Sequence, residues 1–132
     1  MSLKKILDPN RVRKIEGSFS WIDHRLITGG FLQELSPIEI LLYLFLVAVS
    51  DRHGISFYHD DKLCSILKIP LTSLAEAREG LILRSLVAYE FPLYQVLSLP
   101  PYPGSTPTRE EIIQRQREKN LHHIRKIQEA LQ

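Results

Sequence analysis

The sequence predicts a mostly α-helical domain with a small β-wing, an α+β fold, followed by a separate C-terminal helix. Three observations support this prediction. Residues 59–86 have the pattern of two helices joined by a tight turn, which is a helix-turn-helix arrangement. A long apolar helix is expected before them, and two strand-like runs, 87–91 and 94–98, follow them around Pro92-Leu93.

The helix-turn-helix is expected to begin at Asp60, whose carboxylate can accept backbone N–H groups of the first turn. Apolar residues then recur at i, i+3 and i+4, at Leu63, Ile66 and Leu67. Ile69-Pro70 should end this helix, because the residue before a proline avoids the helical region and proline suits a helix start. The second helix is expected from about Leu71 to Arg84.

The helix before this motif has a strong start signal. Ser36 is the expected N-cap, Pro37 occupies the first helical position, and Glu39 completes a capping box. The helix should run to about Ser50 or Asp51. Two apolar sets share it, one made of Ile38, Leu41, Leu42, Phe45 and Val49, the other of Ile40, Tyr43, Leu44 and Val47. A helix that is apolar nearly all round is either central or shares one face with a partner chain, so we expect dimerisation through it.

Smaller elements are expected on both sides of this helix. Ser18 to Ile22 has the composition of a short strand, and Leu26-Ile27 can begin a short helix that ends at Gly29-Gly30. Asp51 to Gly54 reads as a polar turn, followed by a strand over Gly54 to Tyr58.

The charge is unevenly distributed along the chain, whose net charge is +2. Residues 1–18 form a basic arm with 5 basic and 2 acidic groups, or +3, whereas 19–99 have 6 basic and 9 acidic groups, or −3. The remaining 100–132 have 6 basic and 4 acidic groups, or +2; they comprise a Pro-rich linker at 100–108 and a helix at 109–132. A polyanion should therefore be attracted to the ends before the core.

The C-terminal helix should begin with a capping box at Thr108-Arg109-Glu110-Glu111 and run to near Leu131. Its apolar stripe contains Ile113, Ile124 and Ile127 but is interrupted by polar residues, which favours docking on the core or on a second chain over a long coiled coil.

The order helix, strand, helix, turn, helix and two-stranded wing over residues 19–99 resembles the winged helix-turn-helix domains of bacterial replication initiators and small mobile-element proteins. The matching features are Leu35-Ser36, Asp51-Arg52-His53-Gly54, Asp61, Leu63 and Leu67, Leu81, and Leu86-Val87. The resemblance implies that Leu71 to Arg84 is a recognition helix, which in this family enters the major groove of double-stranded DNA.

The side chains of this recognition helix are placed at 100° per residue. Its buried face should contain Leu71, Leu74, Leu81 and Ile82, with Ala77 at the margin. Arg78 lies near the middle of that face, so we expect it to pair with a carboxylate. The opposite face has no Lys or Arg and consists of Thr72, Ser73, Glu76, Glu79, Gly80 and Leu83.

The sequence and the resemblance together leave two functions open. The first is a dimeric DNA-binding protein of replication or transcriptional control, whose expected nucleic-acid contacts are Lys62, Lys68, Thr72, Ser73, Glu76, Lys4, Lys5, Arg11, Arg13 and Lys14. The alternative is a protein–protein interaction module without direct DNA binding. Its expected dimer or partner contacts are Tyr43, Val47, Leu83, Ile113, Ile124 and Ile127.

Other classes of function lack a signal. No nucleophile motif, phosphate-binding loop or metal-ligand spacing is present, so we expect no enzymatic activity, small-molecule substrate, metal or cofactor. The longest apolar run, Ile40 to Val49, is too short to span a membrane. A single cysteine, Cys64, and the absence of a secretory signal in the first ten residues suit a bacterial cytoplasmic protein.

Overall fold

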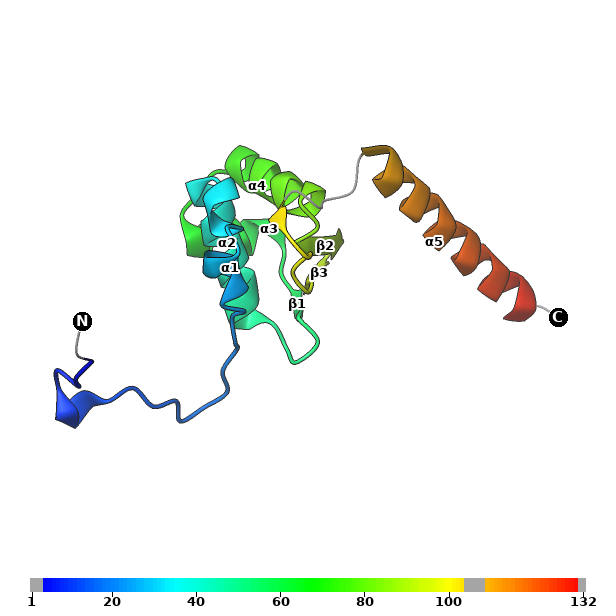
Figure 1. The fold of residues 1–132 in the computed structure, drawn as a ribbon. Coiled ribbons are helices and arrows are strands. Elements are labelled where there is room, and N and C mark those ends of the chain that lie inside the picture. Colours follow the sequence, from blue (N-terminus) through cyan, green and yellow to red (C-terminus); the bar gives the residue numbers. More distant parts are fainter. Residues whose placement is uncertain (1–3, 104–108, 131–132) are drawn as a thin grey trace.

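The computed structural model describes residues 4–103 and 109–130 and is a mixed α+β structure (Figure 1). Two short 3-10 turns lie at Pro9–Arg11 and Leu32–Glu34. The helices are α1 (Arg25–Thr28), α2 (Pro37–Val49), α3 (Asp60–Leu67), α4 (Leu71–Leu83) and α5 (Arg109–Ala130). The strands are β1 (Ile55–Phe57), β2 (Val87–Glu90) and β3 (Leu93–Val96). The expected C-terminal helix is confirmed, whereas its capping residue Thr108 lies outside the described residues.

The three strands form one antiparallel sheet in the order β1-β3-β2. Phe57 pairs with Leu93, and Tyr89 pairs with Tyr94, which fixes the register of both ladders. The β2–β3 hairpin turns through Phe91-Pro92, whose peptide bond is cis. The two wing strands and the strand expected over Gly54 to Tyr58 are therefore confirmed, with the turn of the wing one residue earlier than predicted.

The capping box at the start of α2 is also confirmed. The Glu39 backbone N–H donates to Ser36 Oγ at 3.2 Å, and Ser36 N–H donates to Glu39 Oε1 at 2.8 Å. Because both groups of this reciprocal pair are satisfied, the direction of α2 is fixed before it crosses the core.

The hydrophobic core lies between α2, α4 and the inner side of the sheet. Its fully buried side chains are Leu42, Leu46, Leu63, Leu74, Leu81, Leu86 and Tyr94. The Glu39 carboxylate also lies here and forms an ion pair with Arg84, passing over Gly80. A Cβ at Gly80 would overlap that carboxylate, so the glycine permits α2 and α4 to share this polar contact.

Helices α3 and α4 both end at a residue in the left-handed conformation, Lys68 and Ser85, each with φ of 58°. At the end of α4, Ser85 N–H donates to Ile82 O at 3.0 Å and Leu86 N–H to Leu81 O at 3.1 Å. These are the two hydrogen bonds of a Schellman motif, in which glycine is the usual residue at the position of Ser85.

The expected strand at Ser18 to Ile22 is wrong. This segment is extended but belongs to no sheet, because β1, β3 and β2 pair only with one another. It instead runs past the end of α2, where Ser20 Oγ lies 3.3 Å from the carbonyl oxygens of Ala48 and Ser50.

The expected capping role of Asp60 is wrong as well. The N-cap of α3 is His59, which makes no side-chain capping bond, and Asp60 is the first helical residue. The carboxylate of Asp60 points to α4 because it has a cationic partner there.

Candidate interaction surface of α4 and the sheet

Arg78 of α4 is held by three groups from neighbouring elements. Its Nη1 donates to Asp60 Oδ1 at 2.7 Å and to the Tyr94 hydroxyl oxygen at 2.9 Å. Its guanidinium carbon also lies 4.4 Å from the centre of the Tyr89 ring, a cation–π distance. The prediction that Arg78 pairs with a carboxylate is confirmed, and its charge is directed into the protein.

This cluster changes the ionisation of its members. Burial disfavours the charged form of Arg78, but the hydrogen bonds that Arg78 donates to Asp60 and Tyr94 outweigh this effect and raise its pKa. Burial also raises the pKa of Tyr94 above its ordinary value of 10.0, although the hydrogen bond from Arg78 opposes the change. Both groups therefore stay in the forms that make their hydrogen bond, a cation and a neutral phenol.

Arg84, just beyond α4, is likewise engaged within the chain, by Glu39 and by the carbonyl of Gly80. The solvent-exposed side of α4 consequently has no cation. We name five of its exposed residues the α4 face: Thr72, Ala75, Glu76, Glu79 and Leu83. The α4 face thus presents two carboxylates, one leucine and two small side chains to solvent.

Three residues of α4 differ from the predicted wheel. Gly80, expected on the exposed face, is half-buried beneath the Glu39 carboxylate. Leu71, expected in the core, is 57% exposed, because the first turn of α4 extends beyond the elements that cover Leu74 and Ala77. Ser73 is half-buried and lies with Glu76 along a cleft of about 230 Å³ against Ser36 and Ile38 at the start of α2. Ser73 is therefore directed partly toward α2, while Thr72 and Glu76 remain exposed as expected.

An exposed aromatic cluster lies at one end of the sheet and was not predicted. The His59 ring lies 5.5 Å from each of Phe57 and Phe91, edge to face with both. Phe57 is 59% and Phe91 67% exposed, and Leu93 beside them is also exposed. We name these four residues the sheet tip. The alternation of β1 indicates the opposite, because its apolar residues Ile55 and Phe57 are exposed whereas Ser56 between them is buried.

The expected nucleic-acid contacts do not form one surface. Lys62 and Lys68 are exposed, on α3 and just after it, and the five basic residues of the arm are exposed as well. The arm, blue in Figure 1, leaves the domain on the side away from α4. In this structure the basic arm and α4 therefore face different directions.

The expected partner contacts fall into three groups. Leu83, Ile124 and Ile127 are exposed, as a contact requires, whereas the side chain of Ile113 lies outside the described part. Tyr43 and Val47 are only 5% and 6% exposed. The chain itself covers them, so the expectation that they meet a partner is wrong.

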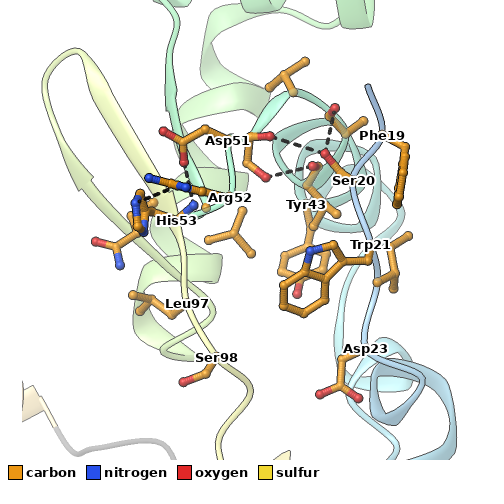
Figure 2. Close-up of a pocket in the computed structure, with 18 of the residues that line it drawn as sticks. Phe19, Ser20, Trp21, Asp23, Tyr43, Asp51, Arg52, His53, Leu97 and Ser98 are labelled. Carbon is orange, nitrogen blue, oxygen red and sulfur yellow. Dashed lines mark hydrogen bonds between the residues drawn. The ribbon is translucent and has the colours of Figure 1, made fainter. Parts of the chain in front are cut away.

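A groove of about 940 Å³ lies over Tyr43 and Val47, between the extended segment 18–23 and residues 95–99 (Figure 2). The acids at its rim serve the local fold. Asp51 Oδ1 accepts from Ile55 N–H at 2.9 Å and His53 N–H at 2.8 Å, and these bonds lower the pKa of Asp51. Asp23, just before α1, likewise accepts from Arg25 N–H at 2.8 Å. Among the described side chains, no three His, Cys, Asp or Glu residues gather as metal ligands would.

Comparisons with protein-family models, curated proteins and solved structures give no match. Within residues 4–103 and 109–130, no helix has the length and apolar character needed to cross a membrane.

Proposed function

We propose that the chain is a winged-helix protein that uses its α4 face to bind another protein, rather than to read a DNA duplex. The order α2, β1, α3, α4, β2, β3 with a short turn between α3 and α4 supports this assignment of the fold. The proposed partner presents basic and apolar side chains, because the α4 face offers Glu76, Glu79 and Leu83.

One observation carries the proposal: the ion pair of Arg78 with Asp60. A helix that enters the major groove needs donors for base edges and cations for phosphates. Arg78 is the only cation in α4, and both the ion pair and the Tyr89 ring hold it on the inner side. The two glutamates left outside would be repelled by phosphates and attracted by a basic protein surface.

The sheet tip supports the same conclusion. Exposed aromatic side chains are enriched in protein interfaces, and Phe57, Phe91 and Leu93 place three large apolar side chains in solvent. The wing of this domain, 87–96, contains no Lys or Arg that could follow a phosphate backbone.

Site-specific photo-crosslinking tests the proposal. A photoreactive amino acid at Ala75, in the centre of the α4 face, should give a protein adduct in cells that express the chain. The same group at exposed Gln33 serves as the control, and the double variant Glu76→Lys, Glu79→Lys should remove the Ala75 adduct. Adducts at Ala75 that contain nucleic acid instead of protein would overturn the proposal.

A second candidate function rests on the N-terminal arm. Its cations Lys4, Lys5, Arg11, Arg13 and Lys14 are all exposed and separate from the acidic α4 face. We propose that any binding of DNA is through this arm, together with Lys62 and Lys68, and is independent of sequence.

A further inference from the structure

Helix α2 is apolar on its outer side as well as on its inner side. Of its 13 residues only Glu39 and Tyr43 carry polar groups, and both are buried. The residues directed to solvent recur at i, i+3 and i+7, at Leu41, Leu44 and Ala48, which we name the outer stripe. Leu41 is 41% and Leu44 39% exposed. A helix that faced only water on this side would carry charged or polar residues there.

The N-terminal segment extends the outer stripe at one end. Ser20 is held at the last turn of α2 by the carbonyl oxygens of Ala48 and Ser50. Figure 2 shows Phe19 and Trp21 pointing in different directions from Ser20. Phe19 is exposed, so a further aromatic ring lies beside the Ala48 end of the stripe.

We propose that the outer stripe of α2 binds the outer stripe of a second copy of this chain, as an antiparallel pair around a twofold axis. Positions 41 and 48 are equally distant from the middle of the stripe, so antiparallel pairing places Leu41 against Ala48 of the other copy. Leu44 then lies beside the axis. The small Ala48 side chain leaves room for Leu41 at the 8–10 Å separation typical of packed helices.

Charge favours a second copy over the other segment that could cover this stripe, which is α5. A twofold axis brings identical groups together, so a symmetric contact is disfavoured when its surface is charged. The outer stripe has no charge. Helix α5 instead surrounds its exposed Leu121, Ile124 and Ile127 with charged residues, for which the outer stripe offers no partners.

Sedimentation velocity on the full chain, over a range of concentrations, tests this pairing. The wild type should form a dimer, and Leu44→Glu should raise its dissociation constant by roughly a hundredfold or more, because it places two carboxylates at the axis. Leu121→Glu replaces a more exposed leucine on α5 and should leave the dimer unchanged. Circular dichroism of both variants checks that they remain folded.

A thiol cross-link gives a second readout that does not depend on loss of binding. In a Cys64→Ser background, Leu44→Cys should give a covalent dimer with a short thiol-specific cross-linker, and Leu121→Cys should not. A wild type that stays monomeric would overturn the pairing, as would a dimer that resists Leu44→Glu or cross-links only through Leu121→Cys. None of these outcomes depends on the α4 face.

Discussion

Arg78 of α4 and Asp60 of α3 form an ion pair with 2.7 Å between Nη1 and Oδ1. The pair connects the two helices of the helix-turn-helix below their solvent-facing surfaces. It also directs the only cation of α4 inward, so the same contact that packs α3 against α4 leaves the α4 face acidic. Stability and surface charge are therefore linked through one side chain.

Loss of this pair should destabilise the fold. Asp60→Ala leaves Arg78 with Tyr94 and the Tyr89 ring but without its carboxylate, and we expect a loss of about 1–3 kcal/mol in the free energy of unfolding. The control Asp61→Ala removes an exposed first-turn acid and should cost less than about 1 kcal/mol. Denaturant unfolding measures both, and equal losses would show that the ion pair adds nothing beyond a helix-end charge.

The effect of Gly80→Ala on stability should change sign when Glu39 is replaced. In the wild type the added Cβ overlaps the Glu39 carboxylate, so the capping box or the Arg84 pair must break, at a cost of about 1–3 kcal/mol. In a Glu39→Ala background the overlap is absent, and alanine should stabilise α4 by up to about 1 kcal/mol through its higher helix propensity. A double-mutant cycle by thermal or denaturant unfolding reports this, and the same sign in both backgrounds would contradict it.

Ser85→Gly should stabilise the protein. Ser85 has φ of 58° after α4, a conformation in which a Cβ costs about 1–2 kcal/mol. Glycine removes this cost, but its greater freedom in the unfolded chain offsets part of the gain. We expect a net increase of about 0.5–1 kcal/mol in the free energy of unfolding. The matched change Ser65→Gly, within α3, should destabilise instead. A melting temperature that falls for both variants would contradict this reading of the helix end.

Alkaline pH should weaken the fold through two tyrosines. Burial raises the pKa of both Tyr43 and Tyr94 above 10.0. A tyrosine with a raised folded-state pKa contributes stability that is fully present below its unfolded pKa. That contribution is lost as the pH rises toward the folded value.

The unfolding free energy should therefore fall above about pH 10 in the wild type. It should fall less steeply with pH in the double variant Tyr43→Phe, Tyr94→Phe. This variant also lacks the Arg78–Tyr94 hydrogen bond, which lowers its stability by a similar amount at every pH and does not change the slope. Identical alkaline slopes would show that neither phenol is held neutral by the fold.

Replacement of the five arm cations by glutamine should weaken binding of a random-sequence duplex and flatten its salt dependence. Each phosphate contact that is lost should lower the slope of log K against log salt by about 0.9. A fluorescence anisotropy titration at several salt concentrations measures the slope. An unchanged slope would remove the arm as the polyanion site.

The sequence was sufficient for features that depend on local chemistry. The capping box of Ser36 and Glu39 and the inward direction of Arg78 follow from residue types at short spacing. The extent of α5 follows from its own pattern. Long-range packing was harder to predict. Helix α2 is apolar all round, so its pattern contains no polar side to indicate which face enters the core. For this reason Tyr43 was assigned to the outer face, although it is buried.

The other errors have similar causes. Phe19 and Trp21 suggested a strand, but a strand also needs a free sheet edge, which the sequence does not show. Asp60 has the composition of a cap, and only the position of Arg78 on another helix decides its role. Leu71 is apolar, but the extent of cover over the first turn of α4 depends on how α2 crosses that helix.

Selection from a pool of random-sequence duplexes tests the central claim most directly. The wild type and the double variant Thr72→Ala, Glu76→Ala are carried through the same rounds, so that any base contact from the α4 face appears as a difference between them. If the α4 face binds protein, neither should enrich a sequence, and both should bind the starting pool equally. Enrichment of one sequence by the wild type, lost in the double variant, would show that α4 reads DNA and would contradict this account.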